Sequence, residues 1–259
     1  MIDVVLLPSQ LPPTGLERSQ VVVLDILRAS STIVTALAHG AREVRLFGDI
    51  DSATAARPTL HPPVLLGGER HCVAIPGFDL GNSPAEYVTH KVGGATVCLT
   101  TTNGTVAAVA ARSAAEIFIG SLLNAAATAR ALLPKIQERD TILLCAGTDG
   151  RVSCEDTFGA GAVCWQLLQQ THSLALPFTD SAWLAYHAFA AVRHHLPAAL
   201  RLGHGGINLI EAGLEDDIDL CARIDSKPII AHVDPATLSV YRAEEIAPLE
   251  EIAPLPDET

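Results

Sequence analysis

The stretch that most constrains the fold is an unbroken apolar run at residues 21–24, which ends in Asp25. A run of mainly β-branched residues without polar alternation is typical of a strand that is buried on both faces, as in an α/β sheet. A helix is expected to follow at residues 33–39. Ligands of such sheets bind beyond the carboxyl ends of the strands, so Asp25 is predicted to lie at a binding crevice.

Between Asp25 and the expected helix lie one basic residue and three hydroxyl residues: Arg28, Ser30, Ser31 and Thr32. Ser and Thr are good N-cap residues, so the helix can direct free N–H groups and the positive end of its dipole toward the crevice. An anion is the natural ligand of such a site. The alternative is that Asp25 pairs with Arg28 and the hydroxyls only cap the helix, since capping requires no function.

Strand-like and helix-like segments alternate along the rest of the chain. The expected strands are residues 3–7, 43–47, 64–66, 96–100, 116–120 and 141–147, with late edge strands at 217–221 and 228–232, and the expected helices are 52–57, 106–112, 121–133, 153–169 and 180–195. This alternation predicts an α/β protein, a three-layer α/β/α architecture with a mixed, largely parallel sheet. We expect residues 1–233 to form a single domain.

Residues 234–259 are expected to form an acidic, Pro-containing tail. The hexapeptide Glu-Glu-Ile-Ala-Pro-Leu occurs at residues 244–249 and again at 250–255. Prolines and acids at this density favour an extended surface arm over a core element.

An acidic and a basic residue, Glu69 and Arg70, follow a Gly pair after the strand at residues 64–66. Glycine permits close backbone approach or a positive φ, so these two side chains are expected in a loop at a strand end. Farther on, Asp79 has no evident local structural role. By contrast, Ser83 and Glu86 have the spacing of a capping box.

The segment Thr101-Thr102-Asn103-Gly104-Thr105 leads from a strand into an Ala-rich helix. It repeats the arrangement at residues 30–32. A capped helix start explains part of this pattern, but the density of polar groups exceeds what one cap needs. Thr102, Asn103 and Gly104 are therefore candidate ligand contacts.

Two acids and one cysteine have competing explanations. Glu155 and Asp156 follow Ser153 at an expected helix start, where the helix dipole favours acidic residues without any catalysis. Cys145 ends a buried strand and could be a nucleophile if its thiol were activated, although an inert buried cysteine is the commoner case.

The formal net charge of −12 argues against a nucleic-acid or anionic-membrane partner, because such partners need clustered Lys and Arg. The six cysteines include no C-x-x-C pair, the start of the chain has no secretory pattern, and no apolar run reaches the ~20 residues that span a bilayer. We expect a cytoplasmic protein with reduced thiols. We also expect a homodimer, with Trp183, Tyr186 and Phe189 in the core or a subunit contact.

Several carboxylates without a Cys/His cluster suit a hard cation such as Mg²⁺, and interspersed Arg residues suit a phosphate or carboxylate. The reaction class that fits is metal-assisted phosphoryl transfer on a small anionic phosphorylated substrate. Neither a P-loop nor a G-x-G-x-x-G motif is present, so no motif supports a bound nucleotide.

At these positions the chain resembles the 2-phosphosulfolactate phosphatase family, known from coenzyme M biosynthesis. The matching blocks keep the same order along the chain and are Asp25-x-x-Arg28-Ala-Ser-Ser, Gly68-Glu69-Arg70, Gly77-Phe-Asp-Leu-Gly-Asn-Ser-Pro84, Thr100-Thr-Thr-Asn-Gly-Thr105, Gly120-Ser-x-x-Asn124, Cys145-Ala-Gly-Thr148 with Glu155-Asp156, and Gly203-His-Gly with Asp217. The resemblance implies a Mg²⁺-dependent phosphatase that hydrolyses 2-phospho-3-sulfolactate to 3-sulfolactate and phosphate. Another small phosphorylated hydroxy acid as substrate, or a protein that only binds an anionic metabolite, remains an alternative.

The resemblance also implies roles for individual residues. The predicted catalytic residues are Asp25, Arg28, Glu69 and Asp79; the predicted substrate-binding residues are Arg28, Arg70, Ser31, Thr102, Asn103 and Gly104; and the predicted metal ligands are Asp25, Glu69, Asp79 and Asp156. A phosphoenzyme formed on Asp25 and direct attack by a metal-bound water both remain open.

Overall fold

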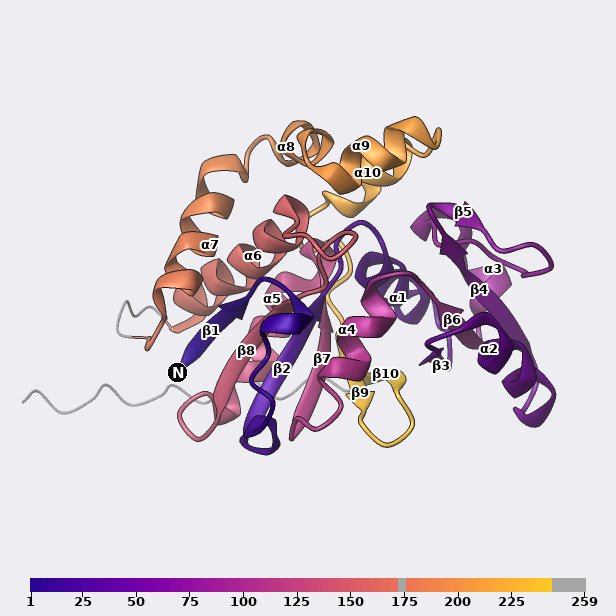
Figure 1. The fold of residues 1–259 in the computed structure, drawn as a ribbon, viewed down its shortest axis with the longest axis horizontal. Coiled ribbons are helices and arrows are strands. Elements are labelled where there is room, and N and C mark those ends of the chain that lie inside the picture. Colours follow the sequence, from indigo (N-terminus) through magenta and orange to yellow (C-terminus); the bar gives the residue numbers. More distant parts are fainter. Residues whose placement is uncertain (172–175, 244–259) are drawn as a thin grey trace, which may run out of the picture.

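The structure is a computed structural model that describes residues 1–171 and 176–243. Its strands form one sheet, which is drawn in Figure 1. In sheet order the strands are β1 (Ile2–Val5), β8 (Asp140–Cys145), β2 (Ser19–Leu24), β7 (Glu116–Gly120), β9 (Ile230–Asp234), β10 (Ser239–Ala243), β3 (Glu43–Leu46), β6 (Thr96–Thr100), β4 (Val64–Arg70) and β5 (Val73–Ala74). The helices are α1 (Ala29–Ala38), α2 (Ile50–Ala56), α3 (Thr89–Val92), α4 (Gly104–Ala110), α5 (Ala125–Leu132), α6 (Cys154–Thr171), α7 (Asp180–Val192), α8 (Leu196–Leu202), α9 (His204–Glu211) and α10 (Asp216–Cys221).

The sheet is mixed and consists of two parallel blocks. Strands β1, β8, β2 and β7 run parallel to one another, and so do β3, β6 and β4. The two blocks are joined through β9 and β10, which pair antiparallel with each other and with the neighbouring block on either side. The expected α/β fold with a mixed, largely parallel sheet is confirmed.

Side chains of β2 alternate between the two faces of the sheet, as a two-residue strand period requires. Val22 and Leu24 belong to the core cluster that includes residues of α5, α6 and α7. Val21 and Val23 belong to the cluster formed with α1 and α4 on the opposite face. Because both faces are covered, the whole of β2 is apolar or buried, and the three-layer arrangement follows.

Two expectations about late strands are wrong. Residues 217–221 lie in helix α10, and β9 is a central strand between β7 and β10, not an edge. The alternation Asp-Ile-Asp-Leu resembles a strand, but three acids in a first turn also suit the positive end of a helix dipole.

The expected domain boundary at residue 233 falls inside β9, and the sheet continues to Ala243. The repeated hexapeptides at 244–255 lie outside the described residues.

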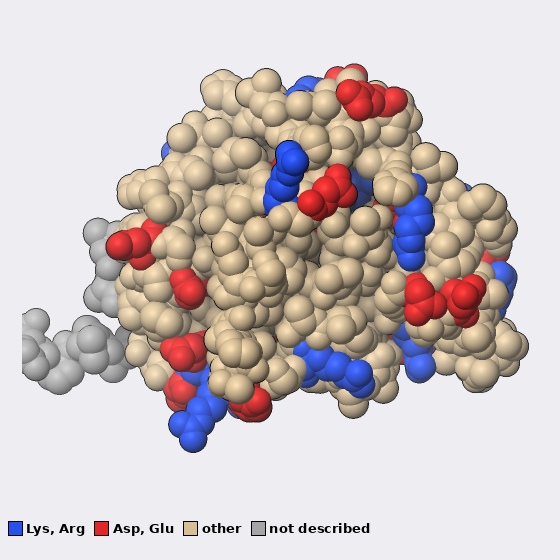
Figure 2. Space-filling view, viewed as in Figure 1, with Lys and Arg blue, Asp and Glu red and all other residues tan. Residues whose placement is uncertain are grey.

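Helices α8, α9 and α10 form a segment between α7 and β9 that lies at one end of the sheet, at the top of Figure 1. The face drawn in Figure 2 has basic and acidic side chains interspersed, without a large basic patch. Within residues 1–171 and 176–243, none of the helices has both the length and the apolar character needed to cross a membrane.

Candidate active site

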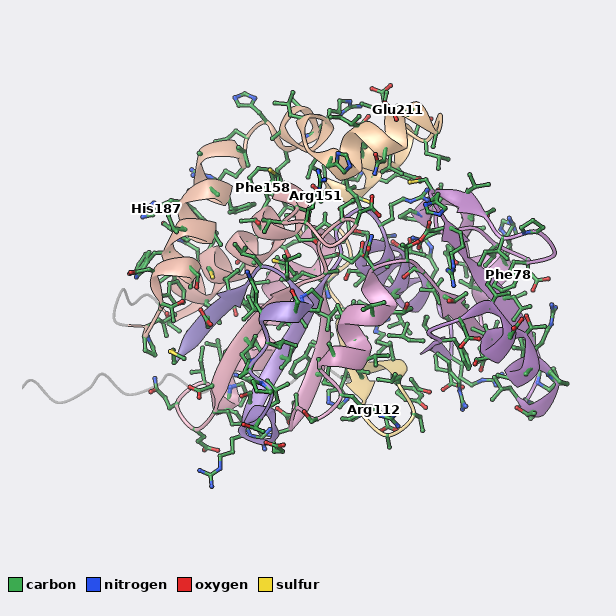
Figure 3. All side chains as sticks on the ribbon, in the orientation of Figure 1. Phe78, Arg112, Arg151, Phe158, His187 and Glu211 are labelled. Carbon is green, nitrogen blue, oxygen red and sulfur yellow. The ribbon has the colours of Figure 1, made fainter. Side chains whose placement is uncertain are left out.

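A cavity of about 440 Å³ lies at the carboxyl ends of the strands. Its walls come from the loops after β2, β6 and β8, from the turn between β4 and β5, and from α9, which carries Glu211 in Figure 3. Five of the predicted site residues line it together: Asp25, Arg28, Glu69, Thr102 and Asn103. The position agrees with the general rule for ligand sites in α/β sheets.

Asp25 is buried and directly follows the last residue of β2, four residues before helix α1 begins at Ala29. Its Oδ1 accepts a hydrogen bond from Ala29 N at 3.2 Å, and its own N–H donates to Ser30 Oγ at 2.9 Å. The expected capping by the hydroxyls is therefore wrong, because they lie inside α1 and Asp25 itself accepts from the first turn. The same arrangement fixes the carboxyl group at the cavity wall.

Burial raises the pKa of Asp25 to about 7, although the hydrogen bond from Ala29 acts in the opposite direction. The nearby charges of Glu69 and Glu155 also raise this pKa. Asp25 therefore holds a proton over part of the neutral pH range when no cation is bound.

Gly104, at the start of α4, packs directly against Asp25. A Cβ atom at this glycine would lie 2.7 Å from Asp25 Oδ2 and 2.7 Å from the Ala29 Cβ. Only glycine allows the loop after β6 to approach the carboxyl group this closely. Gly104 thus contributes to the site by having no side chain, which leaves room for the Asp25 carboxyl group.

The Glu69 carboxylate is held from two sides. Thr102 donates to Oε1 through both its backbone N–H and its hydroxyl, each at 2.9 Å, and Cys72 N donates to Oε2 at 2.9 Å. Glu69 lies in β4, not in the expected loop, because the strand continues to Arg70 before the turn into β5. The three hydrogen bonds fix the carboxylate at the cavity wall.

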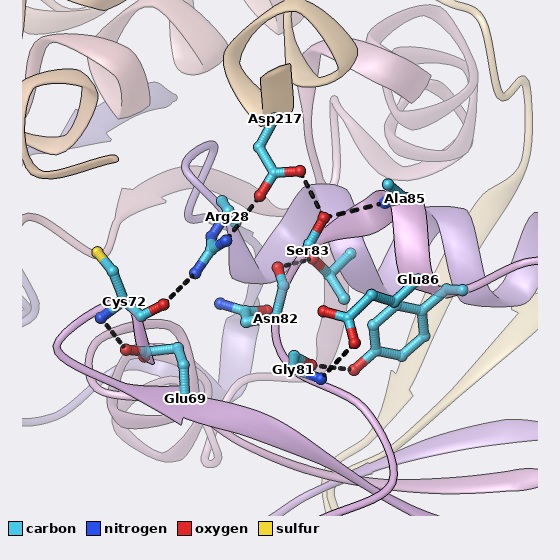
Figure 4. A network of polar contacts seen from close by, with 11 residues as sticks. Arg28, Glu69, Cys72, Gly81, Asn82, Ser83, Ala85, Glu86 and Asp217 are labelled. Carbon is cyan, nitrogen blue, oxygen red and sulfur yellow. Dashed lines mark hydrogen bonds and ion pairs between the residues drawn. The ribbon is translucent and has the colours of Figure 1, made fainter. Parts of the chain in front are cut away.

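Arg28 is buried and forms an ion pair with Asp217 of α10 (Figure 4). Its Nη1 donates to Asp217 Oδ2 at 2.6 Å, and its Nη2 donates to the Cys72 carbonyl oxygen at 3.2 Å. Ser83 donates to the other Asp217 oxygen. These contacts occupy two of the five guanidinium donors and orient the group from the side of α10.

Asp156 and Glu155 lie beside Asp25 at the start of α6. Asp156 accepts from Ile26 N at 2.8 Å and from Gly147 N at 2.9 Å, so both its oxygens bind backbone groups. Burial, followed by the charges of Asp25 and Glu155, raises the pKa of Asp156 well above its ordinary value. Asp156 does not line the cavity. Because both of its oxygens accept from backbone N–H groups, its contacts favour a structural role.

Glu155 is buried, and its Oε2 has no hydrogen-bond partner among the described residues. Burial raises the pKa of Glu155. Hydrogen bonds from Thr148 and from the backbone of Gly205 act in the opposite direction and partly offset this increase. Burial is the largest cause of the raised pKa at both Glu155 and Asp156.

Besides Asp156 and Gly104, three further predicted site residues do not line the cavity: Asp79, Arg70 and Ser31. Asp79 accepts from Leu66 N at 2.8 Å and pairs with Arg57 at 3.1 Å, so it has a local structural role after all. Arg70 and Ser31 likewise make local contacts within the protein.

Arg70 donates to the Glu69 carbonyl oxygen at 2.6 Å and to Thr100 Oγ1 at 3.0 Å. Ser31 donates to the Ile26 carbonyl oxygen at 2.9 Å. Both residues therefore stabilise the elements that carry Glu69 and Asp25 and do not line the cavity.

Cys145 is fully buried in β8, and burial raises its pKa well above the ordinary value for a thiol. This environment opposes thiolate formation. Cys72 lines the cavity, but the pKa of its thiol is also raised, chiefly by burial. The alternative of a cysteine nucleophile therefore lacks support.

Sequence reasoning assigned no site role to Asp217, Asn82 or the residues of α9 on the cavity wall. Asp217 and Asn82 stand in the blocks that carried the family resemblance, and that was the only available signal. Asp217 lies 189 residues from Arg28 in the chain, so no local pattern could pair them.

The cavity wall is acidic. It carries Asp25, Glu69, Asp149 and Glu211, whereas its one guanidinium, that of Arg28, is already paired with Asp217. A ligand with two or more negative charges needs a further positive charge to bind here.

The carboxylates of the cavity wall are the possible ligands of a metal ion. No group of three or more His, Cys, Asp or Glu side chains in the described part of the chain is close enough to hold a metal by itself. Mg²⁺, however, usually takes one or two protein carboxylates, with waters and substrate phosphate completing its octahedron. Asp25 and Glu69, both on the wall, fit that requirement.

The chain is similar to known proteins over most of its length. The family model of 2-phosphosulpholactate phosphatase matches residues 5–235. A protein of Caldanaerobacter subterraneus subsp. tengcongensis named "Probable 2-phosphosulfolactate phosphatase" is 38% identical over 216 residues, which are 83% of this chain and 88% of that protein. Two further relatives have the same name. The protein of Deinococcus radiodurans is 40% identical over 214 residues, which are 82% of this chain and 87% of that protein. The protein of Thermotoga petrophila is 39% identical over 225 residues, which are 87% of this chain and 92% of that protein.

Proposed function

Because the chain belongs to the 2-phosphosulfolactate phosphatase family, we propose that it is a Mg²⁺-dependent phosphatase that hydrolyses 2-phospho-3-sulfolactate to 3-sulfolactate and inorganic phosphate. The observation that carries the proposal is the meeting of Asp25, Glu69 and Arg28 on one cavity wall. The names of the relatives support 2-phospho-3-sulfolactate as the substrate. The acidic residues of the cavity wall support the requirement for a cation.

In this proposal Asp25 and Glu69 hold Mg²⁺. When bound, the ion neutralises charge on the phosphate and on the leaving oxygen. Glu69 is held by three hydrogen bonds, so its carboxylate is already oriented before a ligand arrives. Asp25 lies against Gly104. Its pKa is raised chiefly by burial and further by the charges of Glu69 and Glu155, which a bound cation would offset.

Arg28 binds the substrate anion through guanidinium donors that its partners leave open. Asp217 and the Cys72 carbonyl group hold the guanidinium plane in one orientation, so little side-chain freedom is lost when the anion binds. Thr102 and Asn103 contribute polar groups at the start of α4, where the side chain of the N-cap residue Asn103 makes no capping hydrogen bond. An anionic oxygen is favoured at such a helix end.

We also propose a cytoplasmic location and a homodimer. Leu184, on the exposed side of α7, is 71% exposed beside the partly buried Trp183, which suits a subunit contact. A mass near twice 27.2 kDa in light scattering would support the dimer, and the monomer mass would refute it.

The experiment that tests the catalytic proposal is a phosphate-release assay with 2-phospho-3-sulfolactate, with Mg²⁺ or with EDTA. Release only in the presence of the ion is expected. A protein that merely binds the anion would release nothing under either condition. Faster release from another small phosphorylated hydroxy acid would instead identify that ester as the preferred substrate.

A further inference from the structure

The turn between β4 and β5 lies at the mouth of the cavity. His71, Cys72 and Val73 all line the cavity, and in Figure 1 β5 lies across the end of the sheet from the α8–α10 segment. Strand β5 has only two residues, both exposed, and it forms an edge of the sheet. Little packing therefore holds the turn in place, and segments of this kind open and move most readily.

The backbone of this turn is strained. His71 has φ 52° and Cys72 has φ 65°, so both central residues of the hairpin lie in the left-handed region. Two-residue hairpins favour this geometry but usually reach it with Asn-Gly, because most side chains disfavour a positive φ. Strain of this kind persists only where the surroundings hold it, and it clusters in ligand clamps and switch segments. A turn with this geometry is therefore expected to depend on specific contacts.

Those contacts come from two residues of the active site (Figure 4). Cys72 N donates to Glu69 Oε2 at 2.9 Å, and the Cys72 carbonyl oxygen accepts from Arg28 Nη2 at 3.2 Å. In the proposed function Glu69 holds the cation and Arg28 binds the substrate anion. Any shift of either side chain toward a bound ligand is therefore transmitted to the turn through the Cys72 main chain.

Val73 supplies a reason for the turn to move inward. Its side chain lines the cavity but is 65% exposed, which is an unfavourable position for an apolar group at an acidic wall. Ala212, at the end of α9, is an apolar residue on another wall of the same cavity. Movement of the turn toward α9 would bury Val73 and exclude water from a bound ligand. Charged groups attract one another more strongly once water is excluded.

We propose that residues 70–73 form a lid that closes toward α9 when the cation and the substrate anion occupy the cavity, and this inference rests on the proposed phosphatase function. The structure shows the lid open. Val73 makes the closing contact, and the Cys72 main chain links the lid to Glu69 and Arg28. The lid shields the cavity from solvent and takes no part in breaking the phosphate ester.

Hydrogen exchange followed by mass spectrometry measures closure without turnover. Exchange of the backbone amides in residues 70–75 is compared for the free protein, with Mg²⁺ alone, with 3-sulfolactate alone, and with both. At ligand concentrations about ten times Kd, both together should slow this exchange about 10-fold. The amides of α7, which has no described residue on the cavity wall, should exchange as before.

Two results of the exchange experiment would overturn the lid. One is unchanged or faster exchange of residues 70–75 when both ligands are bound. The other is equal slowing in α7, which would show general stabilisation of the protein by the ligands instead of closure of one segment.

Substitution of Val73 tests the closing contact. Val73→Ser should weaken the binding of 3-sulfolactate in the presence of Mg²⁺ by about 3- to 10-fold in calorimetric titration, because apolar burial is lost. Val152→Ser is the matched control. Val152 is 50% exposed and does not line the cavity, so its replacement should change Kd by less than about 2-fold. Both positions are exposed, so both variants are expected to fold, which circular dichroism checks. Equal Kd values for Val73→Ser and the wild type would overturn the inference.

Failure of the lid and failure of the proposed function give different results. If the wild type releases no phosphate but binds 3-sulfolactate with Mg²⁺, and residues 70–75 become protected, the lid stands without the reaction. If the wild type hydrolyses the ester and residues 70–75 exchange as in the free protein, the reaction stands without the lid. If 3-sulfolactate does not bind in the presence of Mg²⁺, the lid has no ligand to close over and the inference fails.

Discussion

Removal of the Asp217 carboxylate should affect both stability and catalysis, because Asp217 is the buried partner of Arg28. The side chains of the pair are 2% and 4% exposed, and Nη1 and Oδ2 are 2.6 Å apart. Loss of one partner of such a pair leaves a buried charge uncompensated, which costs about 3–5 kcal/mol. At roughly 2–4 °C per kcal/mol for a protein near this size, Asp217→Ala should lower Tm by about 6–20 °C.

Urea unfolding followed by circular dichroism measures the free energy of unfolding, and phosphate release measures kcat/KM. Asp219 offers a matched control on the same helix, since it pairs with Arg201 but is 51% exposed. Asp219→Ala should cost no more than about 1 kcal/mol, as exposed ion pairs do. If Asp217→Ala costs as little as the control and kcat/KM is unchanged, Arg28 does not depend on Asp217 and the account of the site is wrong.

The remaining predictions concern the other cavity residues. Asp25→Asn should lower kcat by about 10³-fold or more while the fold is retained, since it removes the charge that the cation or the attack requires; near-normal kcat would move the active site elsewhere. Arg28→Lys should weaken substrate binding by about 1.5–3 kcal/mol and so raise KM, because the planar pair of guanidinium donors is lost. An unchanged KM would show that Arg28 does not bind the substrate. Mg²⁺ affinity measured by calorimetry should fall about 10-fold per pH unit below pH 7 and level off above it, since protons compete for Asp25, whose pKa is about 7; constant affinity from pH 5 to pH 8 would contradict its role as a ligand.

The position of Asp25 could be predicted from the sequence because the signal is local. A buried strand followed by a polar turn and a helix fixes where the strand ends, and the carboxyl end of the strand is where ligands bind. Thr102 and Asn103 were found by the same reasoning after β6. These residues need only their neighbours in the chain to be placed.

Asp79 and Asp217 could not be assigned in this way. The role of Asp79 depends on Leu66 N and on Arg57, which are 13 and 22 residues away. Asp217 pairs across 189 residues, and its alternating neighbours suggested a strand although the segment is a helix. Tertiary contacts outweighed local pattern at both positions.

The most direct test of the central claim is steady-state phosphate release from 2-phospho-3-sulfolactate by the purified protein, with Mg²⁺ titrated into an EDTA-treated sample. The account predicts no release without the ion, saturable activation by Mg²⁺, and 3-sulfolactate formed in equal amount with phosphate. It also predicts that thiol-blocking reagents leave the rate unchanged, because carboxylates hold the ion and no cysteine takes part in the reaction. Full activity in EDTA, or loss of activity on thiol modification with Mg²⁺ binding intact, would contradict it.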